Sequence, residues 1–300
     1  MRACRSTRSS ARSSAASARQ ACRASSTPST ARSSGPSRPK EASVLQITHE
    51  GPIATVTLDR PDVRNAFNEE LIAGLAQAFR ELGARADVRC IVLAARGPAF
   101  CAGADLNWMR KMADYTREDN LADAGQLAET LRTLYTCPKP TLAKIHGDVY
   151  AGGMGLVAAC DIAVALDTAH FCLSETRLGL VPATISPYVI RAMGARAAHR
   201  YFLSAERFTA TEAHRIGFVH ELVSSGHLDD RVGEIANSLA TAGPAAVRSC
   251  KELLHDVAGQ EITPELIART VQGIADIRAT PEGREGVQSF LQKRKPNWLV

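Results

Sequence analysis

Hydrophobic and polar residues alternate with a period of two in the first ordered part of the sequence, as they do in half-buried β-strands. Residues 44–47 (VLQI) and 53–58 (IATVTL) show this pattern, which predicts a hairpin across Gly51-Pro52. Apolar residues then recur three and four positions apart over residues 71–82, and Asn68 precedes them as a typical helix N-cap. The first unit is therefore predicted to be strand, strand, helix.

Three continuous apolar runs follow, each long enough for a buried strand. They are residues 89–95 (RCIVLAA), 141–145 (TLAKI) and 162–166 (IAVAL). The first two runs lead through glycine-containing loops into helices that we expect to start at about Ala104 and Gly152. Strands that alternate with helices predict an α/β fold with parallel strands.

The pattern becomes helical after about His227. Residues 228–240, 245–257 and 264–277 are amphipathic at helical spacing, and no strand pattern returns. We therefore expect three parts: an extension over residues 1–43, an α/β core over 44–227 and a helical region over 228–300.

Residues 1–43 are mainly Ser, Ala and Arg and, apart from Met1, contain no large aliphatic or aromatic side chain. Such a segment cannot build a core. Its composition is also typical of a mitochondrial transit peptide, although only alanines could supply the apolar face of a transit helix. We favour a disordered extension or an upstream start over a targeting segment.

The net charge of +5 comes from that extension. Residues 1–40 hold eight arginines, Lys40 and no acid, so the rest carries 27 basic against 31 acidic residues, a net charge of −4. A nucleic-acid-binding surface on the folded part is therefore not expected.

The eight cysteines show no CxxC or Cys/His spacing that would predict a metal site. The longest apolar stretch, residues 155–166, is broken by Asp161 and is shorter than the roughly 18–20 residues of a membrane span. We therefore expect no metal, a reducing compartment and a cytoplasmic location, or the mitochondrial matrix if residues 1–43 are a transit peptide.

Two small-residue segments each connect a predicted strand to a predicted helix. Residues 99–106 (AFCAGADL) and 146–155 (HGDVYAGGMG) both place free backbone NH groups at a helix start, where they can bind negative charge. Taken alone, the first segment fits a tight turn with Asp105 near the positive end of the helix dipole better than it fits a binding site. Two such helix starts facing one oxygen would form an oxyanion hole, worth about 10² to 10³ in rate per donor.

A dinucleotide site is an alternative for the second segment. Gly153-x-Gly155-x-x-Ala158 matches the glycine fingerprint, and Glu175 lies at a suitable distance downstream. The register is poor, because residues 146–148 already separate the predicted strand from the loop.

The segments AFCAGADL, AGGMG followed by ACDIAVA, SETRLGLVPA and PEGREGVQSFLQKRKPNW together resemble the crotonase (enoyl-CoA hydratase/isomerase) superfamily. The resemblance covers residues 44–300. It implies a crotonase spiral of strand-strand-helix repeats, a C-terminal helical region that forms homotrimers or hexamers, and an acyl-coenzyme A substrate. No separate cofactor is implied, because coenzyme A is part of the substrate.

The resemblance also implies roles for individual residues. The oxyanion donors would be the backbone NH groups of Ala104 and Gly152. Arg64 would meet the nucleotide phosphates, unless it is an ordinary solvated turn residue. The coenzyme A and substrate channel would be lined by Ala66, Ala102, Asp105, Leu106, Asn107 and Gly153.

Related hydratases use two glutamates, and the position of the first is Gly155 here, so that carboxylate is missing. The second matches Glu175, which lies among Phe171, Leu173 and Leu178. These neighbours should raise its pKa by desolvation and suit it to exchange a proton with Cα.

Around this site the segments NWMRKMA, GGMGLVAACDIAVA and TRLGLVPATISPYVIRAMGARAA resemble the methylglutaconyl-CoA and carboxygeranoyl-CoA hydratases. This implies hydration of 3-methylglutaconyl-CoA to 3-hydroxy-3-methylglutaryl-CoA in leucine breakdown. Arg177 is then a candidate partner for the distal carboxylate of the substrate, or else a surface ion-pair residue. The missing glutamate leaves two alternatives: an enoyl-CoA isomerase, and a non-catalytic scaffold that binds acyl-CoA or RNA.

Overall fold

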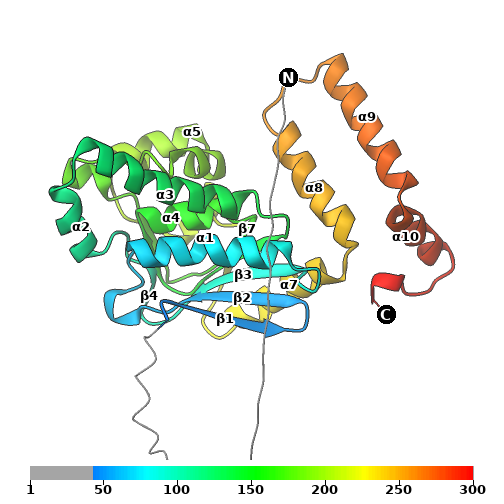
Figure 1. Cartoon of the computed structure of the whole chain (residues 1–300), viewed down its shortest axis with the longest axis horizontal. Coiled ribbons are helices and arrows are strands. Elements are labelled where there is room, and N and C mark those ends of the chain that lie inside the picture. The colour runs from blue at the N-terminus through cyan, green and yellow to red at the C-terminus, as the bar shows by residue number, and fades with distance from the viewer. Residues whose placement is uncertain (1–42, 300) are drawn as a thin grey trace, which may run out of the picture. The chain divides into compact units, whose positions relative to one another are not determined.

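The computed structural model describes residues 43–299, which build two β-sheets and the helices around them (Figure 1). The predicted extension, residues 1–43, lies outside the described residues except for Ser43.

The larger sheet has six strands in the order β1-β2-β3-β5-β7-β10. β1 and β2 form the predicted antiparallel hairpin, and the other neighbours pair in parallel. The prediction of an α/β fold with parallel strands is therefore confirmed. The strands are β1 (Leu45–Glu50), β2 (Ile53–Leu58), β3 (Cys90–Ala95), β5 (Thr141–Ile145), β7 (Ile162–Leu166) and β10 (Glu221–Val223).

Helices cover both faces of the sheet at β3, β5 and β7, which is why these three strands are apolar runs, whereas β1 and β2 at the edge alternate. In β3, Ile91 and Leu93 belong to the core cluster that includes α1 (Glu69–Ala84), whereas Cys90 and Val92 pack against α7 (Leu228–Thr241). α1 begins as predicted, because the Asn68 side chain accepts a hydrogen bond from the Leu71 NH at 3.0 Å.

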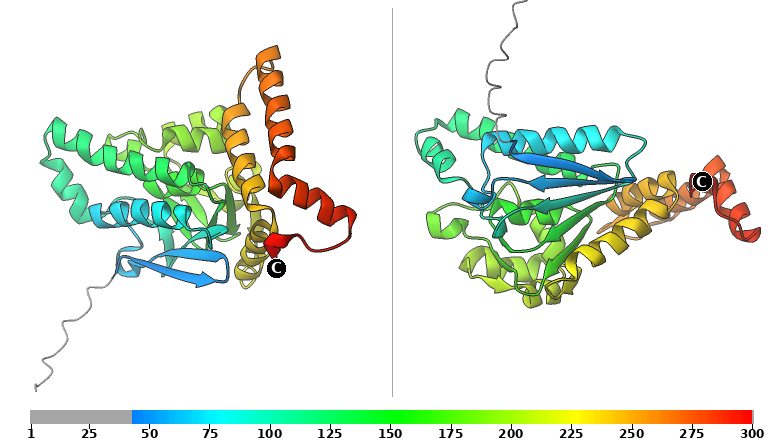
Figure 2. Two further views of the ribbon diagram at one scale, coloured as in Figure 1. Left: turned by 45° about the vertical axis from the view of Figure 1, so that its right-hand side comes forward. Right: turned by 90° about the horizontal axis from the view of Figure 1, so that it is seen from below.

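A second, smaller sheet was not predicted. Its strands are β4 (Ala99–Cys101), β6 (Asp148–Tyr150), β8 (His170–Cys172) and β9 (Phe208–Thr209), in the order β4-β6-β8-β9. Three residues are too few to show a period of two, so the pattern contained no signal for them. Each long strand β3, β5 and β7 is followed by a short one before the chain becomes helical. Figure 2 shows the C-terminal helices, coloured yellow to red, at one end of the strands. The strand-strand-helix spiral that the resemblance implies is therefore the observed architecture.

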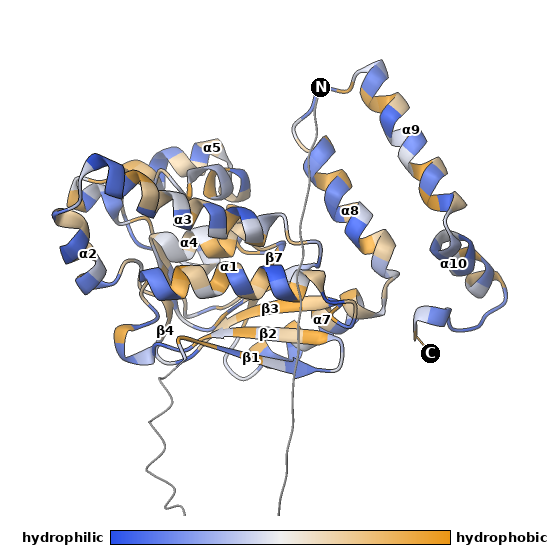
Figure 3. Ribbon diagram, viewed as in Figure 1, coloured by the Kyte–Doolittle hydropathy of each residue, from blue (hydrophilic) through white to orange (hydrophobic). Residues whose placement is uncertain are grey.

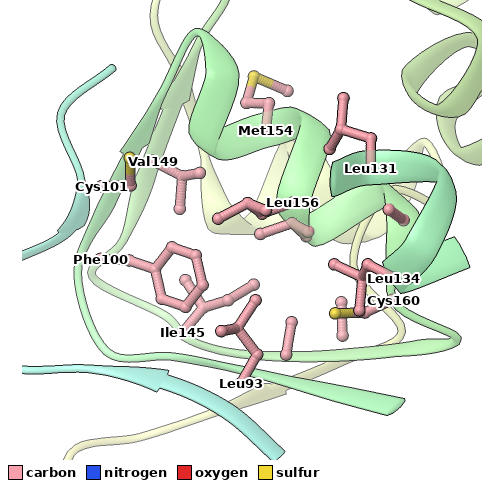
Figure 4. Close-up of a cluster of buried hydrophobic side chains, with 14 of the residues drawn as sticks. Leu93, Phe100, Cys101, Leu131, Leu134, Ile145, Val149, Met154, Leu156 and Cys160 are labelled. Carbon is pink, nitrogen blue, oxygen red and sulfur yellow. The ribbon is translucent and has the colours of Figure 1, made fainter. Parts of the chain in front are cut away.

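The helices of the core follow the short strands. They are α2 (Leu106–Ala113), α3 (Arg117–Tyr135), α4 (Gly152–Ala159), α5 (Ser186–Ser204) and α6 (Ala210–Arg215), with 3₁₀ turns η1 (Pro61–Val63) and η2 (Glu175–Leu178). α4 is surrounded by apolar side chains, including Leu131 and Leu134 of α3 and Ile145 of β5 (Figure 4). The start of this helix is thus held firmly in the core.

The C-terminal region is helical, as predicted, and includes a fourth helix that the pattern did not predict. After α7 come α8 (Pro244–Val257), α9 (Pro264–Ala279), α10 (Pro281–Leu291) and the 3₁₀ turn η3 (Asn297–Leu299). No helix in residues 43–299 is long and apolar enough to cross a membrane.

α8 is joined to the core by an ion pair between the buried Lys251 and the half-buried Asp161. The Lys251 Nζ lies 2.7 Å from Oδ2 of Asp161, which also accepts hydrogen bonds from the Thr141 NH at 2.8 Å and the Thr141 hydroxyl at 2.9 Å. The His255 ring stacks on Tyr135 at the end of α3, with ring centroids 4.3 Å apart. These two contacts hold α8 to the ends of β5 and α3.

We predict that Lys251→Met lowers the free energy of unfolding by about 3 kcal/mol, because it leaves the Asp161 carboxylate without its cation. Arg248→Met on the same helix is the matched control, since Arg248 forms an exposed pair with Glu252 and should lose about 0.5 kcal/mol or less. Urea denaturation of both variants measures the difference, and equal losses would contradict the role of the Lys251–Asp161 pair.

Candidate active site

The predicted site residues stand at one edge of the small sheet. Ala104 follows β4, Gly152 follows β6 and Glu175 follows β8, each within three residues of the strand end. The three strands are parallel, with β6 in the middle, so their carboxyl ends meet at the same edge. Neighbouring strands lie about 4.8 Å apart. The structure thus brings together three residues that are 71 positions apart in sequence from first to last.

The Ala104 NH is kept free by its neighbours. The Phe67 NH donates to the Gly103 carbonyl at 2.7 Å, and the Asp105 NH donates to the Phe67 carbonyl at 2.8 Å, so Ala104 lies between the two bonds of a parallel bridge. In such a bridge the central residue turns its own NH away from the partner strand. Within residues 43–299 no acceptor takes this NH.

The Gly152 NH is presented in a similar way. Ala151 has φ +48° and ψ −120°, an unusual backbone conformation for a residue with a side chain, and its NH is held by the Cys172 carbonyl of β8 at 2.9 Å. The Gly152 NH has no acceptor in the described part of the chain. It therefore stands free at the positive end of α4.

The two donors belong to segments in close contact. A β-carbon on Gly103, which has φ +94°, would lie 3.1 Å from the Ala151 β-carbon. A β-carbon on Gly152 would lie 2.6 Å from the Phe67 ring, closer than real contacts allow. Phe67, which the sequence analysis did not single out, therefore fixes both helix starts: its backbone bridges Ala104 and its ring packs on Gly152.

Glu175 is the first residue of η2 and is half-buried. Its Oε2 is buried and has no hydrogen-bond partner in the described part of the chain. Burial raises the pKa of the Glu175 carboxyl, as predicted. Of the apolar neighbours named for this effect, Phe171 and Leu173 are buried, whereas Leu178 is exposed. A carboxyl group in this condition can hold a proton closer to neutral pH than an exposed glutamate can.

The position of the missing glutamate is filled by packing. A β-carbon on Gly155 would lie 2.4 Å from Cγ2 of Ile185, which is buried at the start of α5. A β-carbon on Gly153 would lie 2.7 Å from that of Cys101. These glycines serve close packing of α4, and nothing in the described residues supports the dinucleotide alternative.

Asp105 is engaged within the fold. Its carboxylate pairs with Arg60 at 2.8 Å and caps α2 by accepting the Asn107 NH at 2.8 Å. Burial pushes the pKa of this carboxyl upward, but the hydrogen bonds from Arg60 and the α2 backbone outweigh burial and hold it below its usual value. Asp105 thus takes the structural role considered for this turn, and its place in a coenzyme A channel stays a prediction.

The other predicted binding residues fall into two groups. Arg64, Leu106, Asn107 and Arg177 are exposed, whereas Ala66 and Gly153 are buried and Ala102 is partly so. The Arg64 carbonyl accepts the Ala102 NH at 3.0 Å, so these two residues are adjacent. Arg64 and Arg177 form no ion pair with any described acid. Both guanidinium groups are free to meet an anionic ligand.

In the part of the chain that the structure describes, no three His, Cys, Asp or Glu side chains form a cluster that could hold a metal ion. His146 opens the second donor segment, and its Nε2 lies 2.8 Å from the Gly97 carbonyl, so its ring serves the fold at this turn.

We predict that Gly155→Ala lowers the free energy of unfolding by about 1–3 kcal/mol, because the new methyl group overlaps Ile185. Ile185→Ala alone should also destabilise, by leaving a cavity. The double variant should lose less than the sum of the two, since the smaller side chain makes room for the methyl group. Denaturation of the four proteins tests this, and additive losses would mean that the two positions do not compete for space.

Comparison with known proteins agrees with this geometry. The enoyl-CoA hydratase/isomerase family model matches residues 48–299. A curated relative, enoyl-CoA hydratase ACTT6 of Alternaria alternata, is 31% identical over 250 residues, which are 82% of this chain and 80% of that protein.

Solved structures are similar throughout the described part. An enoyl-CoA hydratase from Shewanella pealeana is 41% identical with a TM-score of 0.83, covering 85% of this chain and 96% of that one. An enoyl-CoA hydratase from Mycobacterium smegmatis is 33% identical with a TM-score of 0.80, covering 86% of this chain and 99% of that one. The chain belongs to the enoyl-CoA hydratase/isomerase family, within the crotonase superfamily.

Proposed function

We propose that this protein hydrates a branched enoyl-CoA that carries a distal carboxylate, with 3-methylglutaconyl-CoA as the substrate and 3-hydroxy-3-methylglutaryl-CoA as the product. The observation that carries the proposal is the half-buried Glu175, with its unpartnered Oε2 and raised pKa, at the sheet edge that also presents two free NH groups.

In this mechanism the thioester oxygen accepts hydrogen bonds from the Ala104 and Gly152 NH groups. These donors stabilise the negative charge that gathers on the oxygen as water adds to Cβ and the enolate forms. They are already fixed in the fold by Phe67 and Ala151, so little reorganisation is needed when that charge develops. Glu175 then gives its proton to Cα, which completes the addition.

Arg177 supports the choice of a carboxylated substrate. It lies two residues after Glu175, is exposed, and has no acidic partner among the described residues. A guanidinium can hold a carboxylate through two parallel hydrogen bonds. The exposed Arg64 is the corresponding candidate for the phosphates of coenzyme A.

An enoyl-CoA isomerase is the second candidate, and the packing of Gly155 against Ile185 favours it. Moving a double bond requires one proton to leave and another to arrive, which a single carboxylate can perform without added water. The two reactions differ in the mass of the product.

We also propose that the protein is a homotrimer, or a hexamer of two trimers, assembled through its C-terminal helices. α9 shows alternating hydrophobic and hydrophilic residues along its length (Figure 3). Apolar side chains that are at least half exposed include Ile267, Val271, Val287, Phe290 and Leu291. So many exposed apolar side chains on neighbouring helices are typical of an interface. Mass photometry should give three or six times the protomer mass, and a monomer would contradict the assembly.

We predict that incubation with 3-methylglutaconyl-CoA yields a product heavier by one water, detected by mass spectrometry. Glu175→Gln should abolish this turnover while the thioester still binds, since the backbone donors remain. Arg177→Met should raise KM for this substrate but leave crotonyl-CoA, which lacks the distal carboxylate, unaffected. An isomerised product of unchanged mass, or no turnover, would contradict the hydratase proposal.

A further inference from the structure

Asp123 is a second carboxylate in an unusual setting. Within residues 43–299, the two carboxyl groups whose pKa is clearly raised are those of Glu175 and Asp123, in both cases chiefly because of burial. Nothing described so far uses Asp123. It is half-buried on α3, a helix that the sequence pattern did not assign to the site.

The carboxylate is fixed in place by an indole. Oδ1 of Asp123 accepts a hydrogen bond from Nε1 of Trp108 at 3.0 Å, and Trp108 is 5% exposed. Trp108 stands in the first turn of α2, four residues after the donor Ala104. Asp123 is therefore tied to the helix that begins at the predicted oxyanion hole, and its second oxygen is not taken by Trp108.

Asp123 also shares a helix face with the residue that packs on α4. Asp123, Leu127 and Leu131 are spaced four residues apart, which places them along one side of α3. Leu131 belongs to the buried core, and its Cδ2 would lie 3.4 Å from a β-carbon on Gly155. This side of α3 faces α4.

α3 and α4 run in the same direction. Leu131 lies beside Gly155 in the middle of α4, and Cys137, just after α3, is close enough to Cys160, just after α4, to affect its thiol. In Figure 4, Leu131 lies beside α4 and Leu134 lies close to Cys160, which follows the end of that helix. At 1.5 Å per residue, Asp123 lies about 12 Å before Leu131, whereas Gly152 lies about 4.5 Å before Gly155. Asp123 thus extends past the start of α4, on the side to which its free NH groups point.

We propose that Asp123 is the second carboxylate of the active site, taking the place of the glutamate that is missing at Gly155 and binding the water that attacks Cβ. This inference rests on the proposed hydratase function. A residue of α3 then binds the water, because Ile185 fills the space that a carboxylate side chain at Gly155 of α4 would need.

The water oxygen forms a bond to Cβ, and one water proton moves to the Asp123 carboxylate. The electron pair of the Cα–Cβ double bond moves into the enolate, whose oxygen is held by Ala104 and Gly152. The protonated Glu175 transfers its proton to Cα, and the enolate returns to a thioester. Asp123 then loses its proton to solvent and Glu175 takes one up, which restores both groups.

The test is Asp123→Asn, which removes the charge and the basicity but keeps an oxygen that can accept the Trp108 NH. Two rates are measured: hydration of 3-methylglutaconyl-CoA, and exchange of the Cα protons of butyryl-CoA in D₂O. The second reaction needs Glu175 and the oxyanion donors but no added water. We predict that hydration falls about 10²- to 10⁴-fold, as expected for loss of a general base, while Cα exchange is unchanged.

Glu118→Gln is the matched control, because Glu118 is an exposed carboxylate on the same helix and should leave both rates unchanged. Unchanged hydration in Asp123→Asn would overturn the proposal. A parallel loss of hydration and exchange would also overturn it, since that result indicates a structural role. If the wild type exchanges Cα protons but hydrates no enoyl-CoA, the proposed function itself fails.

The pH dependence of hydration distinguishes a catalytic base from a structural residue, because the loss of a structural residue would not shift the pH profile. A base must be ionised, so kcat should fall as the pH drops through the pKa of Asp123. Burial raises this pKa most. The hydrogen bond from Trp108 lowers it in part, and the Glu69 carboxylate on α1, which pairs with Lys111 of α2, raises it. The acidic limb should therefore lie above the usual aspartate range and be absent from Asp123→Asn. An acidic limb of the same position in the variant would contradict the assignment.

Discussion

The close approach of two backbone segments is the constraint on which the rest of the site depends. The turn before α2 and the turn before α4 touch through Gly103 and Ala151, and the Phe67 ring lies against Gly152. Any side chain on either glycine would push the turns apart. Because the segments fit so closely, the NH groups of Ala104 and Gly152 are left without acceptors among the described residues at the same edge of the small sheet, which is the arrangement that the proposed oxyanion hole requires.

The same close packing decides where a carboxylate can stand. α4 is buried on nearly every side, and Ile185 occupies the space that a side chain at Gly155 would need. Glu175 is available because it lies on a 3₁₀ turn after β8 rather than inside a packed helix. Asp123 is available because α3 extends past the start of α4. Burial raises the pKa of both carboxyl groups, because each is partly removed from water and has no cation beside it among the described residues.

The C-terminal helices show a different use of apolar surface. In the core, apolar side chains on both faces of the large sheet are covered by α1 and α7. On α9 and α10 comparable side chains stay exposed, although α8 is anchored to the core by Lys251 and Asp161. This uncovered apolar surface is the one through which the proposed homotrimer would assemble.

The sequence by itself determined five of the six strands of the large sheet, the start of α1 at Asn68 and three of the four C-terminal helices, because periodicity and capping are local signals. The sixth strand, β10, has only three residues and carried no such signal. The sequence also indicated the two donor turns and Glu175. It did not reveal the short strands β4, β6 and β8, which are too brief to carry a period, nor Phe67, whose role depends on residues that are remote in sequence. Only the tertiary structure decided that Gly155 is closed by Ile185 and that Asp123 meets Trp108, because contacts between separate helices depend on how they pack and not on any pattern within them.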